Sequence, residues 1–242
     1  MDQSTVADRV EQVKQVFMEA ASPEEAKQLK KYFRVAPGQY GEGDVFLGIR
    51  MPKIRSFMKD FKDLTLDDLD LLVKNPNHEI RVFSLLMMCE KYKKGSKEEK
   101  EEIGELYLKN KEYVNNWDLV DCSAHIVLEH RIKKDDPLLD ELSKSQSMWD
   151  RRIAMLATFC KIKKGDFEPA INVALTLLGD KQDLIHKAVG WMLREVGKRD
   201  VALLKAFLEE HIDEMHNVTF RYATEKLSSS EISKLKKKKQ KL

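Results

Sequence analysis

The segment NNWDLVD, residues 115–121, combines an aromatic ring with two carboxylates at the start of a mostly apolar helix. Residues four apart share one face of a helix, so Trp117 lies beside Asp121, while Asp118 points elsewhere and charges the first helical turn. Taking a carboxylate out of water is costly unless a nearby group needs its charge. A fixed anion and an indole face both favour a positive charge. The pair therefore indicates a site that stabilises a cation.

A second aromatic position occurs in the segment KAVGWMLRE, where Lys187 lies one turn before Trp191. Arg152 follows a further tryptophan in the segment MWDRR. A lone tryptophan at a helix start more often belongs to a core than to a ligand site. Two aromatics, one carboxylate and two cations facing one groove would be an unusual core, so the set indicates a binding or catalytic site.

The helices that must position these residues recur at a fixed interval. Comparable residues open four helices at positions 81, 117, 152 and 187, at steps of 36, 35 and 35 residues, and RVFSLLMMC at 81–89 matches RIAMLATFC at 152–160 most closely. Such a period fits one helical hairpin per repeat, and stacked hairpins form a solenoid with a continuous core and a concave face. The period is shorter than that of ordinary HEAT or armadillo units. The predicted fold is therefore all-α, a right-handed superhelical solenoid of HEAT-like hairpin repeats.

The equivalent positions of these repeats, Arg81, Trp117, Arg152 and Lys187, are expected to line the concave face. Three cations and an aromatic along one groove fit a polyanion that crosses several repeats, as duplex DNA does. Spacing alone equally allows boundary residues, whose aliphatic stems cover the core while their charged ends remain in water.

Helix signals recur along the whole chain, and alternating strand patterns are nearly absent. Helix starts are predicted at Ser22, Thr65, Ser96, Asp166 and Asp200. Residues 34–49 are the exception, because four glycines and a proline exclude a regular helix there. We expect a tight loop, anchored on the solenoid by Phe46, Leu47 and Ile49.

The composition fits one extended domain over residues 1–230, since 242 residues with 42% hydrophobic side chains can supply a continuous core. The 43 basic and 41 acidic residues leave a net charge of only +2, which argues weakly for any partner. Residues 231–242 form a Lys-rich C-terminal tail. A solvated, frayed terminus is the first expectation for this tail, and weak help in binding nucleic acid is the alternative.

The cysteines and the lengths of the apolar runs indicate the cellular compartment. Three scattered cysteines, Cys89, Cys122 and Cys160, are typical of a reducing environment. No signal-peptide pattern opens the chain, and the longest apolar run is far too short to span a membrane, so a cytoplasmic protein is expected. The histidines form no HExxH and the cysteines form no CxxC, so neither a metal site nor a cofactor is expected.

Four segments resemble, in order and spacing, the signature segments of the DNA alkylation repair enzymes of the AlkD type: YGEGDVFLGIRMPKIR, NNWDLVD, MWDRRIAML and IHKAVGWMLREVGKRD. The resemblance covers nearly the whole chain apart from the lysine tail. It implies a HEAT-like-repeat DNA glycosylase that wraps duplex DNA and excises cationic alkylated bases, such as N3-methyladenine and N7-methylguanine. One departure is Asn116, where some members carry a second tryptophan.

The roles of the family's residues can be assigned to this sequence by their positions in the motifs. The resemblance implies that Asp121 is the catalytic carboxylate and that Trp117 and Trp191 are aromatics facing the lesion. The candidates for contacts with DNA are Arg152, Lys187, Arg81 and Arg55.

A purine with a fixed positive charge is already a good leaving group, so one carboxylate can serve where enzymes that cleave neutral glycosides use an acid and a base. Positive charge moves into the deoxyribose as the N-glycosidic bond stretches, and Asp121 would stabilise it most in the transition state. The expected partner is double-stranded DNA containing alkylated purines, bound by a monomer.

Two other functions stay open at the level of sequence. A non-catalytic relative would bind bent or branched DNA without releasing a base. A helical-repeat scaffold for proteins would show no salt-dependent affinity for DNA.

Overall fold

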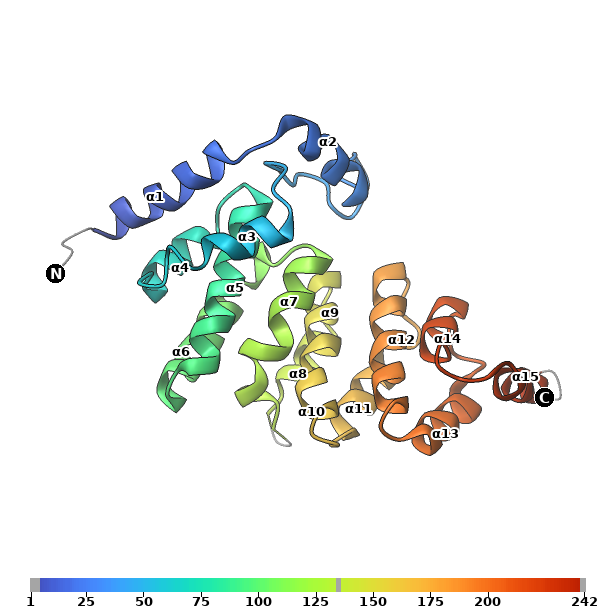
Figure 1. Ribbon diagram of the computed structural model, residues 1–242. Coiled ribbons are helices and arrows are strands. Elements are labelled where there is room, and N and C mark those ends of the chain that lie inside the picture. Colours follow the sequence, from blue (N-terminus) through green and yellow to red (C-terminus); the bar gives the residue numbers. More distant parts are fainter. Residues whose placement is uncertain (1–4, 134–135, 240–242) are drawn as a thin grey trace. The chain divides into compact units, whose positions relative to one another are not determined.

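The structure is a computed structural model that describes residues 5–133 and 136–239. Helices account for the regular structure of these residues, and no strand occurs among them beyond one isolated parallel bridge between Val45 and Asn77 (Figure 1). The predicted all-α, helical-repeat fold is confirmed. No helix in the described ranges is both long enough and apolar enough to cross a bilayer.

The chain divides into two compact units, residues 1–127 and 128–242. The helices of the first unit are α1 (Val6–Glu19), α2 (Pro23–Tyr32), α3 (Met51–Phe57), α4 (Leu66–Leu72), α5 (His78–Lys94), α6 (Lys97–Lys109) and α7 (Trp117–Val127). Within this unit, α5 packs against α3, α4, α6 and α7, so it is the central helix. The prediction of one domain over residues 1–230 stays a prediction.

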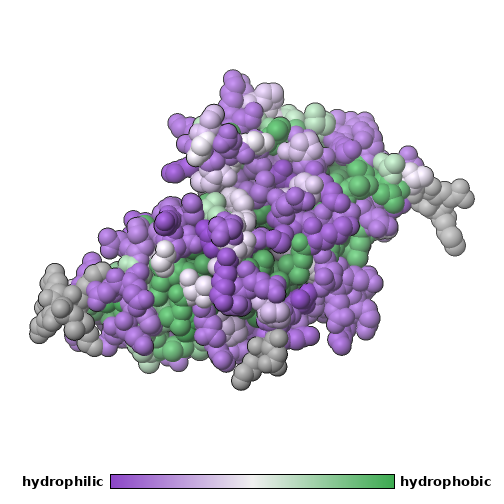
Figure 2. Space-filling model, turned by 180° about the vertical axis from the view of Figure 1, so that it is seen from behind, coloured by the Kyte–Doolittle hydropathy of each residue, from purple (hydrophilic) through white to green (hydrophobic). Residues whose placement is uncertain are grey.

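The second unit is built around α12. Its helices are α8 (Leu138–Ser143), α9 (Met148–Ala157), α10 (Phe159–Ile162), α11 (Glu168–Leu177), α12 (Asp183–Gly197), α13 (Val201–His211), α14 (Asn217–Ala223) and α15 (Ser229–Lys239). Helix α12 packs against α9, α10, α11, α13 and α14. Figure 2 shows that polar side chains cover most of one face of the molecule, as 35% charged residues would suggest.

Local capping explains where several helices begin. Thr65 and Ser96 each form the predicted start, with a reciprocal capping box to the residue three positions later. Asp200 accepts a hydrogen bond from the backbone N–H of Leu203, as expected for a helix cap. The start predicted at Asp166 is wrong, because the N–H of Asp166 instead donates to Lys161 O and closes the preceding turn. Helix α11 begins two residues later.

The glycine-rich segment between α2 and α3 is an anchored loop. The predicted anchors Phe46, Leu47 and Ile49 are all buried. The carboxylate of Glu79 accepts the backbone N–H groups of residues 47–49 at 2.9, 2.8 and 3.1 Å. A buried carboxylate that binds three backbone donors fixes the loop on the start of α5.

Gly48 lies at the tightest point of this loop. Its φ of +87° belongs to the left-handed region, and a Cβ atom there would lie 2.1 Å from the carbonyl oxygen of Ser22. Only glycine meets both conditions, so the close approach of the loop to α2 depends on this position.

The repeats confirm the equivalence of 81–89 with 152–160, because the arginine, leucine and cysteine of each segment are buried. Arg152 and Lys187 are the fifth residues of α9 and α12, Arg81 is the fourth residue of α5, and Trp117 is the first residue of α7. The distance from a helix start does not by itself set the register of a repeat, so the equivalence of Trp117 with the three cations stays a prediction.

The Lys-rich tail is helical as far as the structure describes it. Helix α15 runs to Lys239 and buries Leu235, so the expectation of a frayed terminus is wrong for these residues. Residues 240–242 lie outside the described part of the chain.

Candidate functional site

Trp117 opens α7 and lies on a cluster of aromatic rings. Its indole stacks on Phe33, with ring centroids 5.1 Å apart and planes inclined by 13°, and Phe33 stacks in turn on Phe46. Tyr32 meets the indole edge-on at 5.9 Å and is 64% exposed. The indole of Trp117 is half-buried, because Phe33 supports it from the core side.

The start of α7 is also held by a buried ion-pair network. His78 is the first residue of α5, and its Nε2 lies 2.8 Å from a carboxylate oxygen of Asp118. Its Nδ1 lies 3.1 Å from a carboxylate oxygen of Asp44, in the glycine-rich loop. The His78 ring also stacks on Phe46 at 4.5 Å. Asp118 therefore ties α7 to α5.

Asp44 receives two further donors. Arg81 donates from Nη2 to Oδ1 of Asp44, and Asn116 donates from Nδ2 to Oδ2 at 2.8 Å. Asn116 also accepts the backbone N–H of Trp117 at 2.8 Å. The residue that departs from the family motif thus connects the loop to the first residue of α7.

Charges balance within this network, since two carboxylates face one imidazole and one guanidinium. Burial alone would lower the pKa of His78, but the Asp118 and Asp44 carboxylates on its two nitrogens raise it to about 9. Burial alone would raise the pKa of Asp44, but hydrogen bonding from His78 and the charge of Arg81 hold it at about 2. At neutral pH His78 is therefore a cation and Asp44 an anion.

Arg81 does not line an open groove. Its side chain is 5% exposed, and its Nη1 donates to the carbonyl oxygens of Asn75 and Pro76 while its Nη2 donates to Asp44. A guanidinium that is already bound on several sides inside the protein has little left to offer a phosphate. We correct the expectation of a DNA contact here and assign Arg81 to the buried network.

Asp121 lies one turn after Trp117 on α7 and is half-buried. Burial raises the pKa of the neighbouring Cys122 thiol well above its usual range, and the carboxylates of Asp118 and Asp121 add to that rise, while Arg55 opposes it. The thiol therefore stays protonated at neutral pH. Asp121 is thus next to a thiol that is a poor nucleophile.

Arg55 is an exposed cation on α3 with no ion-pair partner among the residues that the structure describes. It lines a hollow of about 710 Å³, and the other cations that line this hollow are Lys59, Lys62, Lys91 and Lys94. No residue of α7 lines this hollow, but Arg55 lies near enough to α7 to act on the pKa of the Cys122 thiol. Its contact with DNA stays a prediction.

Trp191 lies in the middle of α12 and is half-buried. Its indole donates a hydrogen bond to Glu195, one turn further along, and this bond is among the causes that lower the pKa of Glu195. Burial opposes that shift, and Lys198, whose Nζ lies 2.6 Å from the carboxylate, is the largest cause in its favour. Phe159 meets the indole at 6.4 Å. Trp191 is therefore oriented by one carboxylate and one ring.

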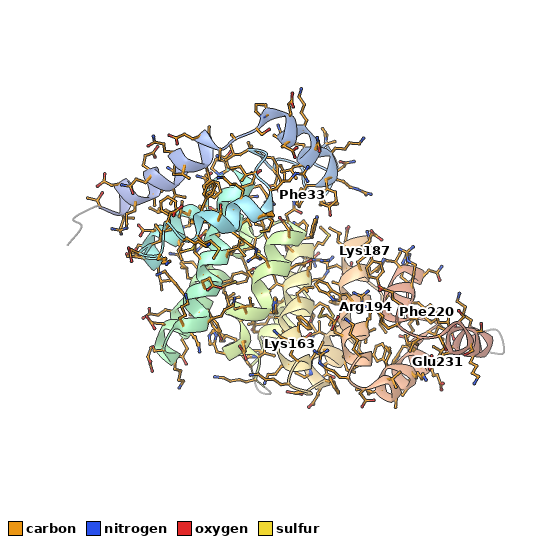
Figure 3. All side chains as sticks on the ribbon, in the orientation of Figure 1. Phe33, Lys163, Lys187, Arg194, Phe220 and Glu231 are labelled. Atoms are coloured by element: carbon orange, nitrogen blue, oxygen red, sulfur yellow. The ribbon has the colours of Figure 1, made fainter. Side chains whose placement is uncertain are left out.

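The two other predicted residues of the second unit lie on packed helices. Lys187 is one turn before Trp191 on α12 and forms a surface ion pair with Asp183 at 2.7 Å (Figure 3). Arg152 is 4% exposed and donates to Leu184 O at 2.5 Å, which links α9 to α12. Arg152 thus reaches the first turn of α12, Lys187 and Trp191 lie further along the same helix, and Lys187 is the more accessible of the two cations.

Sequence reasoning missed four residues that organise the first unit: Asp44, His78, Glu79 and Phe33. Asp44 is one of two acids in the glycine-rich segment, with Glu42, and His78 opens the helix that contains the apolar run VFSLLMMC. An acid beside a predicted loop anchor and a histidine at the start of an apolar helix were the available signals. No group of three or more potential ligands in the described ranges is arranged to hold a metal ion.

These features define a class: an all-helical repeat protein that presents a half-buried carboxylate one turn from an indole, and a second indole with cations on a later helix pair. A family model described as "DNA alkylation repair enzyme" matches residues 13–227. The chain belongs to this family of DNA alkylation repair enzymes, which indicates a role in DNA repair with DNA as the partner.

A solved structure supports the fold. The chain is similar to a "Predicted DNA alkylation repair enzyme from Enterococcus faecalis", with a TM-score of 0.69 and 16% sequence identity over 86% of this chain and 97% of that one. No curated protein matches the chain. The family match spans every candidate residue described above and ends before α15.

Proposed function

We propose that this protein is a DNA glycosylase that hydrolyses the N-glycosidic bond of cationic alkylated purines, such as N3-methyladenine and N7-methylguanine, in duplex DNA. The observation that carries the proposal is the placement of Asp121 one turn after Trp117, on a helix whose start is fixed by a buried network. Membership in the DNA alkylation repair family supports the substrate class.

Asp121 stabilises the positive charge that moves from the base into the deoxyribose as the bond stretches. The base leaves as a neutral purine, so no acid is needed to protonate it. The same carboxylate orients the water that captures the sugar cation. Because the side chain is half-buried, its charge is screened less than that of a surface acid, and its effect on the transition state is larger.

Trp117 and Trp191 hold the cationic nucleotide through their ring faces. An indole attracts a cation by about 0.5 to 2 kcal/mol, depending on how much water is excluded. The stacking of Trp117 on Phe33 and the bond from Trp191 to Glu195 support fixed ring planes. The proposal requires that both units present their rings to one DNA duplex.

Phosphate contacts come from the cations that water can reach. Arg55 is exposed, and Lys187 is held only by a surface pair with Asp183, which a phosphate can replace at little cost. Arg152 is a third candidate by its motif position alone, since it is 4% exposed and donates to Leu184 O.

The test is incubation of methylated duplex DNA with the protein, followed by chromatography of the freed bases. Wild type is expected to release methylated purines, and Asp121→Asn is expected to release them about 100-fold more slowly, since it removes one electrostatic contact to the transition state. Asp60→Asn is the matched control, because Asp60 is an exposed acid of the same unit. It should retain full activity.

Two outcomes oppose the proposal. Equal release by wild type and Asp121→Asn would show that another group is the catalyst. Tight binding of bent or branched DNA with no release by wild type would instead favour a non-catalytic member of the family.

A further inference from the structure

Tyr32, the last residue of α2, places an aromatic ring in water beside Trp117. Its side chain is 64% exposed, although the next residue, Phe33, is buried. Figure 3 shows Phe33 at the end of α2, in the first unit. A single exposed aromatic residue is common on protein surfaces and needs no function. The rings and the backbone around Tyr32 are what distinguish it.

The rings of Tyr32, Phe33 and Trp117 form a three-ring cluster with a defined geometry. Phe33 and Trp117 are stacked, with centroids 5.1 Å apart and planes inclined by 13°. The Tyr32 ring is nearly perpendicular to both, at 5.2 Å and 87° from Phe33 and at 5.9 Å and 75° from Trp117. Because its centroid is almost equally far from both rings, Tyr32 lies beside the stack and not on top of it. The indole face that points away from Phe33 is therefore not covered by Tyr32.

The backbone that carries Tyr32 is held by the glycine-rich loop. The carbonyl oxygen of Tyr32 accepts a hydrogen bond from the Tyr40 hydroxyl at 3.4 Å. Arg34, with a φ of +52°, ends α2 in the left-handed conformation, and its carbonyl oxygen accepts the N–H of Gly41 at 3.1 Å. A Cβ atom at Gly41 would lie 2.3 Å from the carbonyl oxygen of Phe33. The exposure of Tyr32 is thus not that of a frayed helix end.

Tyr32 and Trp117 together form a two-ring corner, in which the ring planes meet at 75°. The face of each ring carries negative electrostatic potential and attracts a cation. The carboxylate of Asp121, one turn after Trp117, adds a full negative charge on the same helix. A cationic purine would gain from all three groups, whereas a neutral purine of the same shape would keep only the dispersion contacts with the rings.

We propose that Tyr32 is a further substrate-contacting residue, and that the two-ring corner selects a cationic purine nucleotide over a neutral one. The inference rests on the proposed function, because it takes a cationic purine in DNA as the substrate. A methyl group by itself gives a protein little to recognise, since one extra methyl changes affinity only modestly. Charge distinguishes the alkylated purine from the many neutral purines around it.

The experiment measures binding without bond cleavage. The probe is a duplex with one 2′-fluoro-N7-methylguanosine, in which the fluorine destabilises the sugar cation and keeps the base attached. The reference is the same duplex with 2′-fluoro-guanosine. Fluorescence anisotropy gives the two dissociation constants, and their ratio is the preference for the cation. Wild type is compared with Tyr32→Leu, Tyr32→Phe and the control Tyr113→Leu, a change in the short helix η1 (Lys111–Tyr113) of the same unit, outside the three-ring cluster.

Tyr32→Leu should lower the preference for the cation by about 3- to 10-fold, because it removes one ring face and keeps an apolar side chain. Tyr32→Phe should keep the wild-type preference, because the ring remains. Tyr113→Leu should also keep it. Thermal melts of all four proteins should agree closely, since the Tyr32 ring lies mostly in water.

Three results would overturn the assignment. An unchanged preference in Tyr32→Leu would show that Tyr32 does not contact the lesion. An equal loss of affinity for both duplexes would make Tyr32 a general DNA contact without selectivity. A loss in Tyr32→Phe as large as that in Tyr32→Leu would assign the effect to the hydroxyl and not to the ring face.

Base release is measured separately, on a methylated duplex without fluorine. A wild-type protein that prefers the cationic probe through Tyr32 but releases no base would refute the proposed glycosylase activity and leave the two-ring corner standing. Normal base release with an unchanged preference in Tyr32→Leu would do the reverse.

Discussion

The two units hold their candidate residues in different ways. In the first, the start of α7 is fixed by buried charges, since His78 is bound by Asp44 and Asp118 and all three are largely out of water. In the second, Trp191 is oriented through Glu195, whose partner Lys198 is 41% exposed, and Lys187 pairs with an exposed acid. One unit is positioned by a neutral network, the other by surface pairs that solvent and phosphate can exchange.

This difference matches two different physical tasks. A carboxylate that must stabilise charge in a transition state works best when its surroundings do not reorganise. A cation that meets phosphate must adapt to DNA that bends and slides, and exposed pairs cost little to break. In the proposed function, the fixed start of α7 therefore suits a carboxylate that acts on the transition state, and the surface pair of Lys187 suits a phosphate contact.

The largest effect is expected from removing the central histidine of the first unit. His78→Ala leaves Asp118 without its cation and removes one of the two cations that bind Asp44, which should lower the free energy of unfolding by about 3 to 5 kcal/mol. The matched change in the second unit is His186→Ala. His186 is also buried, but only its Nε2 is bonded, to Asp180 O at 2.6 Å, so a loss of about 1 to 2 kcal/mol is expected.

Urea denaturation at neutral pH measures both losses. The neutral variant His78→Gln should fall between wild type and His78→Ala, because it restores hydrogen bonds without the charge. Equal losses of unfolding free energy for the two alanine variants would contradict the difference between the two units.

The next effect is a stability window in pH that belongs to the first unit. The pKa of His78 is raised from 6.5 to about 9, so its contribution is complete below pH 6.5 and is lost as pH rises through 9. The pKa of Asp44 is lowered from 3.8 to about 2, so its contribution is complete above pH 3.8 and is lost as pH falls through 2. Thermal melts from pH 5 to pH 10 should show the alkaline loss in wild type. His78→Gln should lack it, and an identical alkaline loss in that variant would assign the titration to another group.

A smaller effect is expected from the carboxylate that orients Trp191. Glu195→Gln keeps an acceptor for the indole but removes the charge that pairs with Lys198, a partly exposed pair worth about 1 kcal/mol or less. Asp118→Asn is the corresponding change in the first unit, where the charged bond to buried His78 should cost about 2 to 3 kcal/mol. Urea denaturation compares the two variants. A larger loss of unfolding free energy for Glu195→Gln than for Asp118→Asn would contradict the assignment of the stronger buried bond to the first unit.

The smallest effect on stability, under 0.5 kcal/mol, is expected for Lys187→Gln, because it breaks only a surface pair. The same variant should reduce the slope of DNA affinity with log salt by about 1. Arg81→Gln should do the opposite, with a clear loss of stability and no change in slope, since Arg81 is buried in the network. A change in the salt dependence of DNA affinity for Arg81→Gln would show instead that Arg81 contacts phosphate.

Features were predictable from the sequence where the interacting residues are close together along the chain. Thr65, Ser96 and Asp200 were predicted as helix starts because a cap depends on residues only three positions away. The buried loop anchors were found because apolar residues among glycines have few other uses.

The network could not be predicted, because its contacts span long stretches of chain. Asp44 meets His78 34 positions away and Asn116 72 positions away, and such pairs leave no periodic signal. The same limit explains Arg81. Its predicted repeat position was that of half-buried Lys187, but its bonds to the distant Asp44 and to the carbonyls of Asn75 and Pro76 turn it inward.

The most direct measurement is the single-turnover rate of base release from a duplex that carries one N7-methylguanine, for wild type, Asp121→Asn and Asp60→Asn. Single-turnover conditions separate bond cleavage from product release. The account predicts a loss of about 100-fold for Asp121→Asn alone, with unchanged thermal stability and DNA affinity. A wild-type rate for Asp121→Asn, in a protein that binds and melts normally, would contradict it.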